Sequence, residues 1–132
     1  MKAHPKTGTT GEFTFVVGPE HTITFATDGM PAVLSTPNLI GLLERTARES
    51  LQPFLDADER TVGTEIELRH LAPSPLGARV TITTRVIHAE GRAVSFQVEA
   101  RDEHEVIARG VHKRGVIRTG SFAKRVAGKS KT

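Results

Sequence analysis

The chain has 132 residues, of which 37% are hydrophobic and 25% charged, with a formal net charge of +3 and no cysteine. A chain of this size fits one domain with a real core, and the lack of cysteine excludes disulfides, thiolate metal sites and cysteine nucleophiles. No apolar run approaches the ~18 residues that a membrane-spanning helix needs, and the polar first ten residues lack the apolar stretch of a secretion signal. We therefore expect a single domain over residues 1–132 that resides in the cytoplasm and has no membrane partner.

The first elements have strand chemistry. Residues 12–17 and 21–26 are rich in β-branched and aromatic side chains and are separated by Gly18 and Pro19. This pattern predicts either a hairpin or one bent strand.

One helix is strongly indicated after these strands. Ser35 or Thr36 can act as its N-cap, Pro37 occupies the first helical position, and Pro53 lies just beyond its end. Apolar residues recur at fourfold spacing along it, at Leu39, Leu43, Ala47 and Leu51. The segment therefore predicts a helix of about four turns with one apolar face.

Four runs that alternate apolar and polar residues follow the helix, at 62–71, 78–88, 93–101 and 105–118. The short turns between them predict an antiparallel meander. One apolar helix face and one apolar face on each strand are both buried if the sheet wraps around the helix. The fold class expected is therefore α+β.

The C-terminal residues are basic, and we expect residues 1–10 and 124–132 to be flexible, with a frayed and solvated tail. A phosphate-binding role for the tail is the less favoured alternative. The chain has no tyrosine or tryptophan, and its six phenylalanines are not interleaved with basic residues. Because base-stacking surfaces are not visible, nucleic acid is not an expected partner.

His70 ends the strand run on its apolar face, together with Ile66 and Leu68. Partial burial there would lower the pKa of the imidazole and keep it neutral, available as a base or a hydrogen-bond partner. A histidine in this position can equally be a core-edge residue satisfied by a backbone carbonyl. His112 is a weaker candidate that could face the same cleft.

Glu44 borders the buried stripe of the predicted helix, where a carboxylate can serve as a base. The alternative is an ordinary i to i+4 ion pair with Arg48. Gly41 costs about 1 kcal/mol in a helix interior relative to alanine, and the close approach of another backbone or a ligand would explain it.

Thr36 fits a helix cap as well as a catalytic hydroxyl. Glu44 lies eight residues later, about 12 Å along a helix axis, so the two side chains would meet only across a substrate or water, or in a helix that starts later. No spacing of histidines or acids fits a metal site, and none is expected.

The order of elements and several motifs resemble the hotdog-fold thioesterases, most closely the fluoroacetyl-CoA thioesterase group. The resemblance covers about residues 11–125. Its motifs are Leu39-Ile-Gly-Leu-Leu-Glu44, Gly63-Thr64 followed by His70, Ala72-Pro-Ser-Pro-Leu-Gly77, Glu90-Gly-Arg92 and Gly110-Val-His-Lys-Arg-Gly-Val-Ile117.

This resemblance implies a long helix wrapped by an antiparallel sheet, and a homodimer, or a higher oligomer, with active sites at the subunit interface. It implies that Thr36, Glu44 and His70 are catalytic and that Gly63 and Arg114 line the acyl pocket. The segment 27–34 differs from the longer, phenylalanine-rich lid of the fluoroacetyl-specific enzyme, so selectivity for a fluorinated acyl group is not implied.

The leading hypothesis is hydrolysis of a small acyl-CoA thioester to a carboxylate and free CoA, with no cofactor other than the CoA of the substrate. Glu44 or His70 would activate water or support an acyl-enzyme step, and Thr36 would position the nucleophile or the carbonyl. The alternatives are a non-catalytic acyl-CoA or small-ligand binding domain and, less favoured, an enoyl thioester hydratase or dehydratase.

Overall fold

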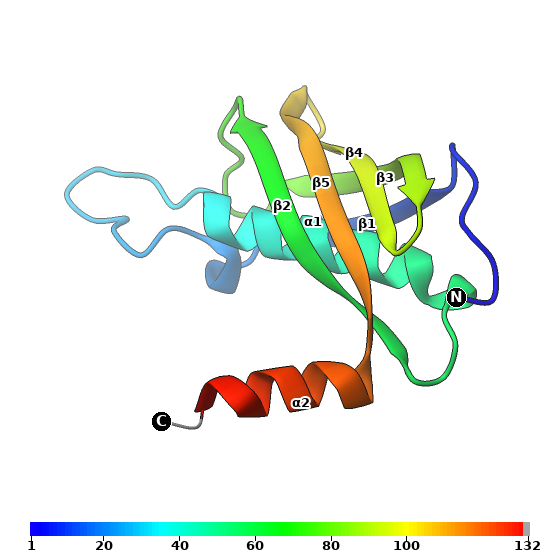
Figure 1. Ribbon diagram of the computed structural model, residues 1–132. Helices are drawn as coiled ribbons and strands as arrows, with labels where there is room; N and C mark the ends of the chain where they lie inside the picture. Colours follow the sequence, from blue (N-terminus) through cyan, green and yellow to red (C-terminus); the bar gives the residue numbers. More distant parts are fainter. Residues whose placement is uncertain (131–132) are drawn as a thin grey trace.

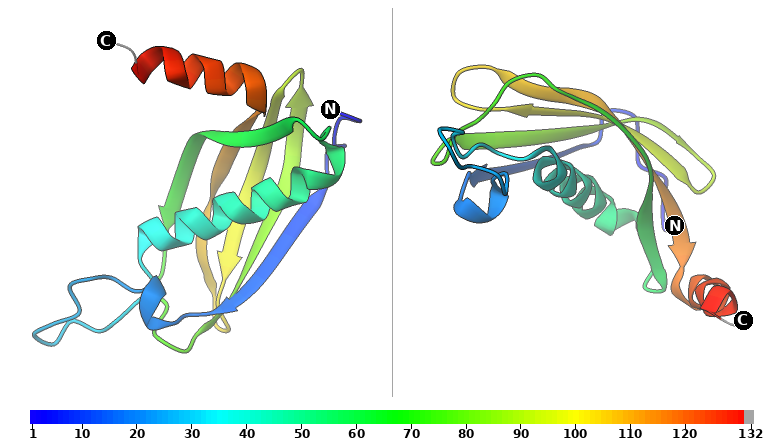
Figure 2. Two further views of the ribbon diagram at one scale, coloured as in Figure 1. Left: turned by 90° about the horizontal axis from the view of Figure 1, so that it is seen from below. Right: turned by 90° about the vertical axis from the view of Figure 1, so that its left-hand side faces the viewer.

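The computed structural model describes residues 1–130 and shows one antiparallel sheet curled around a long helix (Figures 1 and 2). The helices are α1 (Thr36–Leu51) and α2 (Thr119–Ser130), and two short 3₁₀ turns lie at Pro19–His21 and Gln52–Phe54. The strands are β1 (Thr10–Val16), β2 (Glu59–His70), β3 (Arg79–Glu90), β4 (Ala93–Arg101) and β5 (Val106–Arg118). The predicted α+β architecture and the four predicted later strands are confirmed.

The strands lie in the order β1-β3-β4-β5-β2, and every neighbouring pair is antiparallel. β2 therefore pairs on one side with β5, the last strand of the chain, and forms one edge of the sheet. The predicted meander holds for β3, β4 and β5 and is wrong for β2, because the long connection before β3 lets that strand cross to the other side of the sheet. The β2–β5 register shifts between Gly63 and Glu65, which leaves a bulge at Thr64. Bulges of this kind bend a strand and re-aim its side chains.

Helix α1 begins as its sequence predicts. The Ser35 hydroxyl accepts a hydrogen bond from the backbone N–H of Asn38 at 3.3 Å, so Ser35, and not Thr36, is the N-cap. The four apolar residues at fourfold spacing are fully buried against the concave face of the sheet. Burial of each of the three leucines contributes about 1.5–3 kcal/mol, and this packing fixes the side chains on the rest of the helix relative to the sheet.

The predicted strand at 21–26 is wrong. Pro19 begins a 3₁₀ turn in which the Gly18 N–H donates to His21 Nδ1 at 2.9 Å, and the chain then runs irregularly to α1. A single bridge between Thr22 and Leu34 is the sheet-like pairing left in this segment. Phe25 is exposed, so the alternating pattern has no core face to bury.

Both ends of the described chain make defined contacts or form regular structure, and the flexibility expected for residues 1–10 and 124–132 stays a prediction. The Met1 ammonium lies 2.7 Å from Glu59 Oε1, and Glu59 also accepts a hydrogen bond from Arg92. The ammonium, followed by the backbone N–H of Asp56, lowers the pKa of the buried Glu59 carboxyl to about 2. At the other end residues 119–130 form α2, whereas Lys131 and Thr132 lie outside the described residues.

Neither α1, α2 nor any other helix within residues 1–130 has both the length and the apolar character needed to cross a membrane.

Candidate active site

Thr36 and His70 meet at one end of the sheet. Thr36 is the first residue of α1 and His70 the last of β2, and the Thr36 hydroxyl lies 2.7 Å from His70 Nδ1. The two residues are 34 positions apart in the chain. They line a cavity of about 300 Å³ whose walls include the apolar side chains of Ile23, Val33 and Leu34.

The other ring nitrogen of His70 is unsatisfied. Nε2 is buried and has no hydrogen-bond partner among the described residues. Burial lowers the pKa of the His70 imidazole below its ordinary value, as predicted, so the ring is neutral near pH 7. His70 is thus not the core-edge histidine satisfied by a carbonyl, because its one hydrogen bond goes to a hydroxyl that a hydrolase can use.

Glu44, on α1, belongs to a second group of residues, which lies beside the middle of β2. Glu44 Oε2 lies 3.6 Å from the guanidinium of Arg114, on β5, and does not form the alternative surface pair with Arg48. Gly63 is the β2 residue beside them. A Cβ at Gly63 would lie 2.5 Å from Glu44 Oε2 and 3.3 Å from His112 Cε1, so a larger residue here would force the carboxylate out of its present position. Glu44, Gly63 and His112 line a cavity of about 260 Å³.

Arg114 and His112 form a buried network behind Glu44. The Arg114 guanidinium donates to the hydroxyl and the carbonyl of Thr61, each at 2.8 Å. His112 Nδ1 lies 2.8 Å from the carbonyl of Glu65, which can only accept, so Nδ1 carries the proton. Nε2 is then free to accept from Arg114, 3.2 Å away.

Burial lowers the pKa of both the His112 imidazole and the Arg114 guanidinium. The His112 ring also stacks on Phe96, with the ring centres 6.2 Å apart. His112 is consequently held neutral and in one tautomer, and it leaves Arg114 one donor direction toward Glu44.

The five predicted site residues thus fall into two groups within one protomer. Thr36 and His70 lie together, and Glu44, Gly63 and Arg114 lie together. Because Thr36 is the first helical residue, Glu44 lies about 12 Å further along the axis, and the two groups line different cavities. The sequence did not indicate Thr61, although the alternation of β2 places it on the same face as Gly63.

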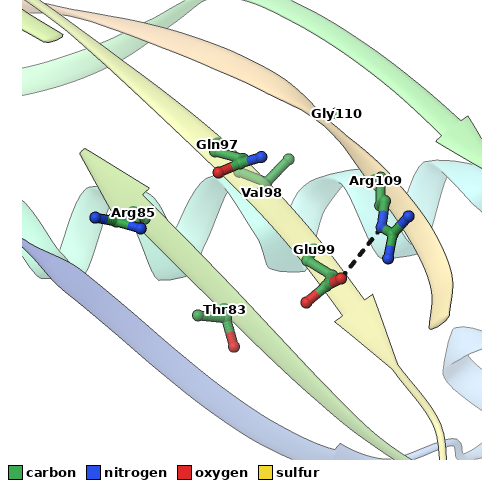
Figure 3. Close-up of a pocket in the computed structure, with 7 residues that line it drawn as sticks. All are labelled: Thr83, Arg85, Gln97, Val98, Glu99, Arg109 and Gly110. Carbon is green, nitrogen blue, oxygen red and sulfur yellow. Dashed lines mark hydrogen bonds and ion pairs between the residues drawn. The ribbon is translucent and has the colours of Figure 1, made fainter. Parts of the chain in front are cut away.

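Gly41 does not mark a close approach within the protomer, since a Cβ there would meet nothing within 4 Å. A further hollow of about 440 Å³ lies away from the predicted residues, on the outer face of the sheet (Figure 3). It is lined mainly by polar side chains, and its Arg109 and Glu99 form an ion pair at 3.2 Å. No catalytic constellation accompanies that hollow.

Comparisons with known proteins identify the fold. A hypothetical protein of Thermus thermophilus, described as a thioesterase superfamily member, has a TM-score of 0.85 and 28% identity, with 99% of this chain and 98% of that chain covered. A fluoroacetyl-CoA-specific thioesterase variant solved in complex with fluoroacetate and CoA has a TM-score of 0.82 and 31% identity, with 89% and 99% covered. The fold and the site define a hotdog-fold thioesterase.

The sequence comparisons narrow the assignment. The fluoroacetyl-CoA thioesterase of Streptantibioticus cattleyicolor is 35% identical over 100 residues, which cover 76% of this chain and 72% of that protein. The family model for the fluoroacetyl-CoA-specific thioesterases matches residues 17–120. The chain belongs to this family, and the predicted class of enzyme, a thioester hydrolase acting on acyl-CoA, is confirmed.

Proposed function

We propose that the protein hydrolyses a small acyl-CoA thioester and that its working unit is a homodimer with the site between the subunits. The observation that carries the proposal is the 2.7 Å contact between the Thr36 hydroxyl and His70 Nδ1, at the mouth of an apolar-walled cavity. A neutral imidazole against a hydroxyl is the arrangement that activates an oxygen nucleophile. A cavity of about 300 Å³ suits a short acyl group.

In the reaction we assign to this pair, the Thr36 oxygen attacks the thioester carbonyl while its proton passes to His70 Nδ1. The carbon–sulfur bond then breaks, His70 returns the proton to the CoA sulfur, and an acyl-threonine remains. His70 next takes a proton from water while the water oxygen attacks the acyl carbon. The bond between that carbon and the Thr36 oxygen then breaks, His70 returns the proton to the Thr36 oxygen, and the acid leaves as the carboxylate after losing its proton to solvent. The start of α1, where the helix dipole is positive, favours the oxyanion.

Glu44 joins this chemistry through the second subunit. β2 is an open edge of 12 residues, and such edges commonly pair. Pairing of β2 with β2 of the partner would bring Glu44 of the partner subunit toward Thr36 and His70, and it would offer a group to the unsatisfied His70 Nε2. We assign Glu44 the role of orienting water or His70, with Arg114 and Gly63 fixing its carboxylate. The lack of cysteine fits the cytoplasmic location we retain for the enzyme.

The test is release of free thiol from a panel of short, branched and aromatic acyl-CoA esters. The protein itself has no cysteine, so a thiol reagent reports CoA alone. We expect turnover of short acyl esters by the native chain and almost none by Thr36→Ala or His70→Ala. Tight binding of the esters, measured by calorimetry, without release of CoA would instead indicate a binding domain and contradict the proposal.

A further inference from the structure

Helix α2 is amphipathic and has little of its own protomer to pack against. None of its residues is buried, and Phe122 and Val126, one turn apart, remain 38% and 51% exposed. A small, mostly apolar hollow separates Phe122 from Ile117 at the end of β5. Its charged residues, Lys124, Arg125 and Lys129, are all basic. An exposed apolar stripe on such a helix indicates a missing partner surface.

The position of α2 indicates where that surface lies. The helix starts beside the Glu59 end of β2, where Thr119 N–H donates to the Asp58 carbonyl. From there it runs across the strand direction and projects past the open β2 edge (Figure 2, left). Its 12 residues span about 18 Å, the spacing of three to four strands. The helix therefore extends into the space that a subunit paired along β2 would fill.

The opposite end of β2 carries complementary features. Leu71, directly after His70, is 55% exposed and borders the Thr36–His70 cavity. Leu71 N–H donates to Ile107, at the start of β5, so the turn that joins β4 to β5 lies at this same end. That turn carries three carboxylates, at Asp102, Glu103 and Glu105. One end of β2 thus presents an apolar, basic helix and the other an apolar residue beside an acidic turn.

We infer that α2 of each subunit docks on the partner subunit, with Phe122 and Val126 covering Leu71 of the partner and the mouth of the partner's Thr36–His70 cavity. A two-fold axis through an antiparallel β2–β2 pair places the Glu59 end of one strand against the His70 end of the other. The same two-fold axis places the basic helix α2 of each subunit beside the acidic β4–β5 turn of the other subunit. Each active site is then closed by a helix of the other chain. This inference rests on the homodimer of the proposed function.

Cysteine cross-linking tests the contact between Phe122 of one subunit and Leu71 of the other. Because the native chain has no cysteine, only the introduced residues can react. Leu71→Cys and Phe122→Cys are combined in one chain and treated with an oxidant or a short bismaleimide. Within one protomer Leu71 follows the His70 end of β2, whereas α2 starts at the Glu59 end. The 12-residue strand between them spans about 36 Å, too far for a disulfide or a short linker. We expect most of the protein to run as a covalent dimer on a non-reducing gel.

The matched control combines Phe122→Cys with Val16→Cys, an equally exposed residue on β1 at the far edge of the sheet. This control and the single variants should stay monomeric on the gel. If sedimentation shows a dimer but the Leu71–Phe122 variant does not cross-link, the docking of α2 is wrong and the homodimer stands. If sedimentation shows a monomer, both the homodimer and the docking fail, while thiol release still tests the hydrolase.

A kinetic measurement tests the closing role. Phe122→Ser should raise KM for a short acyl-CoA about fivefold and leave kcat unchanged, because the helix covers the site without touching the reacting atoms. Phe122→Leu should restore most of the affinity, and Val16→Ser should change neither constant. A kcat that falls with KM unchanged, or no change at all in Phe122→Ser, would contradict the inference.

Discussion

The two groups of site residues differ in how far a single protomer completes them. The Thr36–His70 pair rests on one hydrogen bond, lies beside an open cavity and leaves His70 Nε2 without a partner among residues 1–130. The network behind Glu44 is saturated: the Arg114 guanidinium has contacts to Thr61, His112 and Glu44. The Thr36–His70 pair leaves space for a substrate atom to bind, whereas the Arg114 network holds the Glu44 carboxylate in place.

This difference indicates which changes should affect chemistry and which should affect positioning. A residue of the open pair can be altered with little effect on folding, since few contacts depend on it. A change in the saturated network disturbs several buried polar groups together, and leaving one unsatisfied costs about 1–3 kcal/mol. Four predictions separate the two regions, from the largest expected effect on activity to the smallest.

His70→Ala should lower kcat/KM by about a thousandfold, the usual scale for loss of a general base. His70 is only partly buried and makes one side-chain hydrogen bond, so the melting temperature should change little. Thiol release and a thermal melt on the same sample measure both effects. An active His70→Ala protein would show that His70 is not the base. An inactive protein that has also unfolded would show that the Thr36–His70 pair, like the Arg114 network, supports the fold.

Gly63→Ala should lower kcat/KM about a hundredfold, because the new Cβ would overlap the place that Glu44 Oε2 occupies. The matched control is Gly115→Ala, opposite Val62 in the same strand pair, where a Cβ would meet Thr64 at an ordinary 3.5 Å. The control should retain nearly full activity. Equal losses in both variants would mean that the strand pair, and not the carboxylate, is being disturbed.

His112→Asn should lower kcat/KM about tenfold, since it keeps a donor for the Glu65 carbonyl but loses the acceptor that holds Arg114. His112→Gln places an amide where Nε2 lies and should recover part of the activity. The effect should fall on kcat, because Glu44 acts in the transition state. Identical kinetics for the two variants would show that His112 serves packing against Phe96 alone.

The pH dependence of kcat/KM should follow His70 and not His112. Burial lowers the pKa of both rings, so each stays neutral down to below pH 6.5. Protonation of His70 removes the base, and activity should therefore fall on the acid side only below pH 6.5. His112→Gln should keep this acid limb. A limb centred above pH 6.5, or one that disappears in His112→Gln, would assign it to another group.

Local patterns predicted most of the fold. Alternation identified β2 to β5, and the Ser35 cap with Pro37 identified α1, because hydrogen bonding and amphipathicity act over a few residues. The prediction of a strand at 21–26 was wrong because alternation is a local pattern, and in the fold no neighbouring strand is available to bury Phe25. Helix α2 carried a usable signal, the spacing of Phe122 and Val126, which the surrounding basic residues obscured.

The sequence proposed five site residues but could not indicate how the fold groups them. The contact between Thr36 and His70 depends on the relative placement of a helix end and a strand end, which no local spacing contains. Glu44 pairs with Arg114 and not with Arg48 because β5 lies next to β2 in the sheet, and no local spacing in the sequence contains that strand order. The roles of the five residues remain predictions, as does the subunit arrangement that would unite them.

The strand order also governs how the chain reaches its folded state. β2 is the second strand to be synthesised, but its partner within the chain, β5, is the last. The β2–β5 pairing, from Glu59 opposite Arg118 onward, can therefore form only after nearly the whole chain has been made. Contacts this distant in sequence slow folding, since loop closure precedes the gain from pairing. During synthesis the backbone N–H and C=O groups on both edges of β2 are unpaired. In a chain released before residue 106 they would stay unpaired and could pair with other chains, which leads to aggregation.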